Sequence, residues 1–189
     1  MPQPKYTQAE HIMMASEGLT ALRSEEIYFH DDFKTWENKF LLHSKASGKP
    51  IEFFGTSRAE ICKRRIQWHQ ELAKEILYTL RYEASKPEDF YQIEDMTSEI
   101  ECLRYHLQEG RITLKWLGSS EELISKINRK YHRQQAEGYL RLLRQTRGNL
   151  LLFTEYLKHL RSEISAAETT LEQLESSEQE IMDLRFRQA

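Results

Sequence analysis

Five basic residues recur at helical intervals between positions 126 and 144. A row of Lys and Arg side chains along one helix can follow a phosphate backbone, and such binding weakens steeply as the salt concentration rises. No base-stacking or groove-reading motif accompanies the row, so a solvated face, or pairing with acidic parts of the chain, explains it more simply. We define this basic stripe, the candidate contact to an anion or nucleic acid, as Lys126, Lys130, Arg133, Arg141 and Arg144.

The net charge of −3 hides an uneven distribution along the chain. Residues 104–161 hold 12 basic and 5 acidic groups, whereas residues 162–189 hold 2 basic and 7 acidic groups. Residues 1–103 are also acidic, with 13 basic and 18 acidic groups. Such asymmetry can steer an anionic partner, or it can let one part of the molecule pack on another. We favour the second interpretation.

Residue types suited to metal binding or nucleophilic catalysis are present, but their spacing is unsuitable. The seven histidines are scattered, and neither His-Glu-x-x-His nor Cys-x-x-Cys occurs. The Glu-x-x-His pairs of di-iron bundles are also missing. Cys62 and Cys102 cannot form a disulfide framework, which favours a reducing environment. We therefore predict a non-enzymatic protein with no catalytic residue, no metal site and no cofactor.

A heptad pattern of apolar residues dominates the last third of the chain. A seam that repeats every 3.5 residues needs a facing helix, so association within or between chains is the first property to explain. All but Thr146 and Glu178 of its fourteen positions are apolar. The fourteen positions are Ala136, Tyr139, Leu143, Thr146, Leu150, Phe153, Leu157, Leu160, Ile164, Ala167, Leu171, Leu174, Glu178 and Ile181. The seam is broadened by further apolar residues between Tyr139 and Phe153, so the acidic end from about Ile164 is expected to be less covered and to need a partner. The protein-interaction seam predicted there comprises Leu157, Leu160, Ile164, Leu171, Leu174 and Ile181.

This seam predicts either one long C-terminal helix or a helical hairpin. Ser119 and Glu122 have capping-box spacing, and no proline follows them. Gly148-Asn149 is a typical helix stop. Leu143 and Leu150 nevertheless lie seven residues apart, so the seam passes the Gly-Asn pair without a change of phase. The preserved phase favours a continuous helix of roughly 96 Å.

Residues 1–118 show shorter amphipathic segments that indicate an N-terminal helical bundle. Residues 51–54 would form a strand or lead into the next helix. Residues 111–117 could form a strand that pairs with 51–54, but two short strands alone make a marginal sheet, so a helix is favoured there. The spacing of apolar residues, the Ser57–Glu60 capping box and Pro87 predict helices over about 7–23, 24–43, 57–85 and 89–108.

Together these patterns predict an all-α protein. Residues 1–118 would form the N-terminal helical bundle, and residues 119–189 a long C-terminal coiled-coil helix or helical hairpin. We interpret the chain as a protein–protein interaction module (an adaptor, scaffold or assembly subunit) that binds another protein or itself as an oligomer through the seam. Nucleic-acid binding through the basic stripe is the alternative. No N-terminal signal pattern and no bilayer-spanning apolar run occur, so we expect a soluble, cytoplasmic (intracellular) protein.

Overall fold

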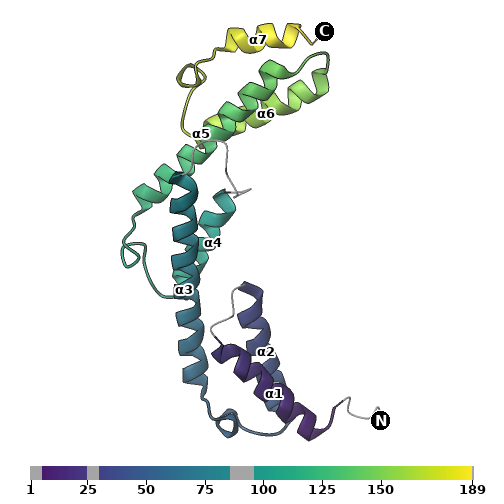
Figure 1. Cartoon of the computed structure of the whole chain (residues 1–189), viewed down its shortest axis with the longest axis vertical. Helices are drawn as coiled ribbons and strands as arrows, with labels where there is room; N and C mark the ends of the chain where they lie inside the picture. Colours follow the sequence, from purple (N-terminus) through teal and green to yellow (C-terminus); the bar gives the residue numbers. More distant parts are fainter. Residues whose placement is uncertain (1–5, 25–29, 86–95, 189) are drawn as a thin grey trace. The chain divides into compact units, whose positions relative to one another are not determined.

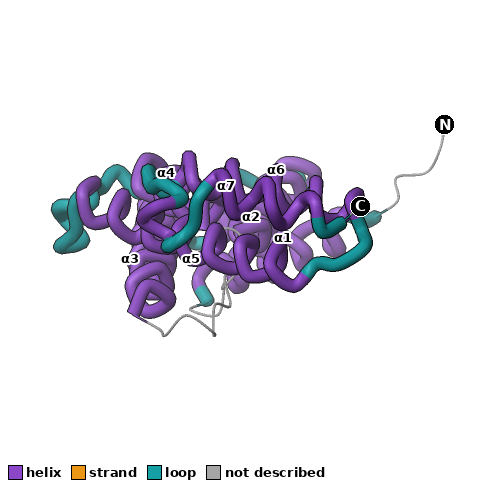
Figure 2. The backbone as a smooth tube through the Cα atoms, turned by 90° about the horizontal axis from the view of Figure 1, so that it is seen from above, coloured by secondary structure: helices purple, strands orange, loops and turns teal. Residues whose placement is uncertain are grey.

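The computed structural model describes residues 6–24, 30–85 and 96–188, and for these residues the predicted all-α class is confirmed. Helices and loops, and no strands, make up the described part of the chain (Figure 2). The α-helices are α1 Gln8–Arg23, α2 His30–Ala46, α3 Arg58–Ser85, α4 Met96–Glu109, α5 Glu121–Gln145, α6 Leu150–Ala166 and α7 Glu178–Phe186. Two short 3-10 helices are η1 Ile51–Phe54 and η2 Glu172–Leu174.

The chain divides into two compact units that are interleaved in the sequence. Unit 1 comprises Met1–Lys74 and Tyr105–Thr113, and unit 2 comprises Glu75–Arg104 and Leu114–Ala189. Each of α3 and α4 therefore contributes residues to both units. The domain boundary after residue 118 stays a prediction. The expected beginnings of the helices over 24–43 and 89–108 lie in part outside the described residues.

Unit 1 contains a hairpin in which α1 and α2 lie side by side (Figure 1). A complete capping box begins α1: the Thr7 amide donates to the Glu10 carboxylate (2.6 Å), and the Glu10 amide donates to the Thr7 hydroxyl (3.3 Å). A Cβ atom at Gly18 would lie 3.0 Å from the backbone nitrogen of Phe40. Gly18, a weak point by helix propensity, thus sits where the backbones of α1 and α2 come close together.

The core of unit 1 joins this hairpin to α3. The predicted Ser57–Glu60 capping box is present and begins α3, with the Ser57 amide 2.9 Å from the Glu60 carboxylate. From α3, Trp68 stacks on Phe33 of α2 with ring centroids 5.3 Å apart. The buried cluster comprises Ala15, Leu19, Leu22, Phe33, Phe40, Ile61 and Trp68.

Two short segments of the chain differ from the sequence-based expectation. Ile51–Phe54 forms a 3-10 helix rather than a strand, and Gly55 ends it in the left-handed conformation (φ 69°). Residues 111–117 form turns, so the helix predicted there is wrong. Left-handed residues bound the segment on both sides, with φ 53° at Arg111 and φ 66° at Gly118, and a helix cannot continue through either.

Unit 2 contains a second hairpin, in which α5 and α6 lie side by side (Figure 1). The chain reverses at Gly148 (φ 65°), and Asn149 caps α6 by accepting a hydrogen bond from the Leu152 amide (3.0 Å). Leu143 is fully buried, whereas Leu150 is 49% exposed, so their seven-residue spacing is coincidental. The continuous helix favoured by the phase of the seam is therefore wrong, and the hairpin alternative is what forms.

The chain beyond the hairpin folds back over α5 and α6. Leu174 and Ile181 are buried in the same core as the hairpin. The side chain of Gln188 donates to the Thr146 carbonyl (2.8 Å) and accepts from the Asn149 amide (3.3 Å), which ties the C-terminal end to the turn. The expectation that the acidic end needs a second chain to cover its apolar residues is wrong, because the hairpin covers them.

Candidate interaction surface in unit 2

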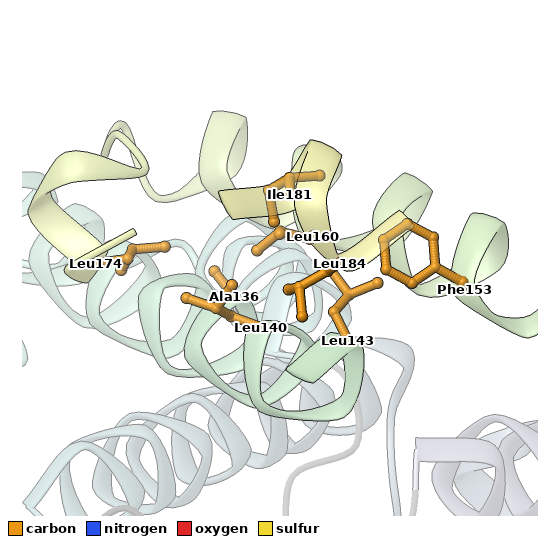
Figure 3. Close-up of a cluster of buried hydrophobic side chains, with 8 residues drawn as sticks. All are labelled: Ala136, Leu140, Leu143, Phe153, Leu160, Leu174, Ile181 and Leu184. Carbon is orange, nitrogen blue, oxygen red and sulfur yellow. The ribbon is translucent and has the colours of Figure 1, made fainter. Parts of the chain in front are cut away.

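The six residues of the predicted protein-interaction seam lie in or against the core of unit 2. Three are buried members of the cluster shown in Figure 3: Leu160, Leu174 and Ile181. The other three are partly buried and pack against that cluster: Leu157, Ile164 and Leu171. In the structure the seam holds α5, α6 and α7 together. Its role as a contact to another protein stays a prediction.

The basic stripe lies exposed along α5, and part of it is engaged inside unit 2. Lys130 donates a hydrogen bond to the carbonyl of Ala84. Arg133 donates to the carbonyl of Gln173, at 3.1 Å, and so fastens the segment around η2 to α5. The stripe therefore has a structural function in which carbonyl oxygens take the place that phosphate oxygens would occupy on a nucleic acid.

Arg144 makes the most extensive contacts of the stripe. Its guanidinium binds both carboxylate oxygens of Glu180 on α7 (2.8 and 3.1 Å) and donates to the Glu175 carbonyl (3.3 Å). The Ser176 hydroxyl donates to the same carboxylate (2.8 Å). The hydrogen bond to Arg144 is the main reason that the pKa of Glu180 lies below its ordinary value. This bidentate pair fixes α7 against α5.

Further ion pairs join the acidic C-terminal residues to arginines of α5 and α6. Arg129 on α5 lies 2.8 Å from Glu168, and Arg161 on α6 lies 3.6 Å from Glu178. The charge asymmetry read from the sequence thus serves packing within unit 2. The remaining stripe residues, Lys126 and Arg141, form no side-chain hydrogen bond or ion pair with the residues that the structure describes.

Three stripe residues meet at a groove of about 330 Å³ between α5 and the η2 segment. Arg133 and Arg144 are held there by the contacts described above, whereas Arg141 has no such partner. The other lining residues are Glu137, Leu140, Gln173, Leu174 and Glu175. The groove therefore presents one uncommitted guanidinium beside polar walls, an arrangement that suits a single acidic side chain.

A second surface, which sequence reasoning missed, lies where α5, α6 and α7 meet at the hairpin turn. We call it the turn-end surface and define it as residues 141–151 and 182–187. The contacts of Gln188 to the turn place the end of α7 beside it. Its exposed apolar side chains include Leu151, 82% exposed, and Phe186, 73% exposed; the others are Leu142, Leu150 and Met182.

The turn-end surface is also strongly basic. Its residues include five arginines and a single acidic residue, Asp183. Arg144 is the one paired with Glu180, and Asp183 accepts a hydrogen bond from Gln179 (2.9 Å). The sequence did contain a signal: Leu151 lies beside the seam but off it, and Arg147 lies close to it within the basic residues 104–161. The signal could not be used before the hairpin was known, because only the hairpin brings these segments together.

A chain of hydrogen bonds joins α4, α5 and α6 elsewhere in unit 2. His132 Nδ1 lies 2.6 Å from a carboxylate oxygen of Glu163, and its Nε2 lies 3.2 Å from the hydroxyl of Thr97. Hydroxyl, imidazole and carboxylate stand in the order of a catalytic triad. The hollow beside Thr97 measures only about 110 Å³, however, which is small for a substrate site. We therefore give this chain a structural role.

Metal and membrane chemistry find no support in the described residues. Within residues 6–24, 30–85 and 96–188, no group of three or more His, Cys, Asp or Glu side chains is placed to hold a metal ion. None of the described helices combines the length and apolar character needed to cross a bilayer.

The described helices and their packing define an all-α protein built of helical hairpins. Comparisons of the chain with family models, with curated proteins and with solved structures give no match.

Proposed function

We propose that the protein is a non-enzymatic protein–protein interaction module, an adaptor, scaffold or assembly subunit, that docks a partner on the turn-end surface. The observation that supports this is that five large apolar side chains of the turn-end surface are exposed, on segments that the contacts of Gln188 hold together. Single exposed apolar residues are normal on protein surfaces, whereas a group of them beside polar residues is typical of a binding site. In this proposal the partner contacts the turn-end surface, and the seam packs α5, α6 and α7 beneath it.

The occupant we propose is an acidic amphipathic helix of another protein. Apolar side chains at helical spacing would pack on Leu151 and Phe186, and carboxylates beside them would face the arginines of the turn-end surface. Among these arginines, Arg141 also lines the groove beside η2, where its guanidinium can accept the carboxylate of an acidic side chain. Opposite charges across an interface favour this orientation and speed the encounter of the two proteins.

The energetic contribution of the apolar contact can be bounded. Full burial of a Leu or Phe side chain contributes about 1.5–3 kcal/mol, so replacing Leu151 with Glu should weaken binding by roughly 10- to 100-fold. The same replacement should change the free energy of unfolding by only about 0.5 kcal/mol, because the Leu151 side chain is 82% exposed. Binding and stability are therefore separable at this position.

The test is a selection from a displayed library of random helical peptides on the full-length protein. We expect the enriched peptides to carry apolar residues at i, i+3 or i+4, together with Asp and Glu. Fluorescence anisotropy of an enriched peptide should then show weaker binding to Leu151→Glu and to Phe186→Glu. Leu42→Glu is the matched control, since Leu42 is 63% exposed on α2 in unit 1.

Several outcomes would refute the proposal. Peptides that bind all three variants equally would place the contact elsewhere, and enriched peptides without acidic residues would contradict the charge argument. A labelled DNA or RNA duplex that binds where peptides do not, with affinity lost in Arg141→Glu and at moderate salt, would favour the nucleic-acid alternative. Light scattering that shows a dimer dependent on Leu151 would make a second copy of this chain the occupant.

A further inference from the structure

A hollow in unit 1 lies among α2, η1 and the beginning of α3. Its volume is about 560 Å³, which is within the range of small-molecule sites. Two loop glycines in the left-handed conformation shape its walls: Gly48 (φ 68°) after α2 and Gly55 (φ 69°) before α3. Between them the chain turns so that Lys49 and Arg58, on opposite sides of η1, line the same space.

The loop that forms one wall is fixed by buried hydrogen bonds. Ser44, 2% exposed, donates its hydroxyl hydrogen bond to the Lys49 carbonyl (3.2 Å). Ser47, also 2% exposed, donates to the Ser44 carbonyl (2.7 Å) and accepts from the Lys49 amide (3.3 Å). A ligand therefore meets a wall that is already formed, and binding need not order it.

Basic side chains outnumber acidic ones around this hollow. Of its two carboxylates, Glu37 lies 3.5 Å from the guanidinium of Arg65 and is neutralised by it. Glu52 is the other. Three further cations line the space and form no ion pair with a described carboxylate: Lys45, Lys49 and Arg58. The hollow thus carries an excess of positive charge that a single dianionic group would balance.

One side of the same hollow is apolar. Leu41, Ile51 and Ile61 line it, and they continue into the buried cluster of unit 1. Cations on one side and aliphatic side chains on the other suit a ligand with a charged head and an apolar body. We propose that this hollow binds a phosphate monoester with an apolar or aromatic body: the phosphate lies among Lys45, Lys49 and Arg58, and the body packs on the aliphatic side. This site is independent of the proposed docking function.

Phenyl phosphate is a suitable probe, and the full-length protein is the material. Isothermal titration should show binding that weakens at least about tenfold in Lys49→Glu and in Arg58→Glu, because each removes a charge-assisted contact. Lys63→Glu is the matched control: Lys63 is an exposed cation of α3 that does not line the hollow. Circular dichroism would establish that all three variants keep their helical content.

Cys62 provides a second and local readout. It lines the hollow, whereas the other free thiol, Cys102, lies in α4 within unit 2. Phenyl phosphate should therefore slow the alkylation of Cys62 by iodoacetamide and leave that of Cys102 unchanged, as measured by peptide mass spectrometry. The alkylation of Cys102 therefore serves as the internal control for protection of Cys62 by the ligand.

The ligand chemistry can come from a soluble ester or from a lipid headgroup, and the arms of the experiment separate the two. Binding of phenyl phosphate in solution indicates a soluble ester. Flotation with vesicles of phosphatidylcholine and phosphatidic acid, without binding of phenyl phosphate, indicates a headgroup, provided Lys49→Glu abolishes it. The proposal is overturned if neither probe binds at millimolar concentration, if benzoate binds as tightly as phenyl phosphate, or if Lys63→Glu weakens binding as much as Arg58→Glu.

Discussion

Leu143 and Leu150 offer a direct test of how the apolar seam is used, because both belong to it and lie seven residues apart. In a coiled coil they would occupy equivalent positions and contribute equally. In the hairpin Leu143 is fully buried, whereas Leu150 is 49% exposed at the beginning of α6. The same substitution, Leu to Ala, should therefore have unequal effects at the two positions.

The magnitudes follow from burial. Leu143→Ala removes buried methyl groups and leaves a cavity, which costs about 2–5 kcal/mol. Leu150→Ala leaves no enclosed cavity and changes surface that is already half hydrated, so we expect a loss of about 1 kcal/mol or less. With urea m-values of about 1–3 kcal/mol/M, the midpoint for Leu143→Ala should fall by roughly 1 M or more.

The assay is urea unfolding followed by far-UV circular dichroism, with amide hydrogen exchange over residues 121–166 to localise the effect to α5 and α6. Midpoints should not depend on protein concentration, since the seam is covered within one chain. Equal losses at Leu143 and Leu150, or midpoints that rise with concentration, would refute the hairpin and restore the coiled coil between chains.

Three further predictions concern other contacts. Gly18→Ala should destabilise unit 1 by about 1–3 kcal/mol, because the new methyl group meets the backbone of α2. Helix propensity alone would favour Ala by about 1 kcal/mol, so a rise in the thermal midpoint would contradict this prediction. Glu180→Gln should cost no more than about 1 kcal/mol at neutral pH, since the pair with Arg144 is partly exposed. Because the pKa of Glu180 is lowered, the wild-type protein should lose this contribution as the pH falls below about 4.5, and the variant should not. The Nδ1 atom of His43 lies 2.8 Å from Nδ1 of His11, and burial is the main reason that the pKa of His43 is lowered. The unfolded chain therefore binds more protons than the folded chain near this pKa. The free energy of unfolding should fall as the pH drops below about 6.5, and it should fall less in His43→Gln.

Local signals in the sequence predicted much of the secondary structure. The spacing of apolar residues placed α1 almost to the residue, and the Ser57–Glu60 capping box and Pro87 did the same for α3, because these signals act within a few residues of the helix end. The same logic missed by one residue at α5, where Ser120 rather than Ser119 accepts from the Leu123 amide. It failed at 111–117, because the left-handed conformation of Arg111 has no sequence signature comparable to glycine.

The path of the last third of the chain was harder to predict. A heptad pattern reports which residues are buried together and does not report whether the facing helix follows a turn or belongs to another chain. At Gly148-Asn149 the local helix-stop signal was correct, and the phase argument that opposed it rested on Leu150, which lies half outside the core. The groove beside Arg141 and the turn-end surface depend on that turn, and so they could not be placed from spacing alone.

Removal of residues 163–189 distinguishes a seam covered within one chain from a seam that joins two chains. The first arrangement predicts more association after truncation, and the second predicts less. If the seam joined two chains at its acidic end, truncation after Ser162 would yield a monomer. In the structure the removed segment carries Leu174, Ile181 and the carboxylate that Arg144 binds, and its loss uncovers Leu160 and the rest of the hairpin core. Uncovered apolar surface of this kind drives association. We therefore expect light scattering to show more association after truncation than before it, and a well-folded truncated monomer would contradict the fold-back arrangement.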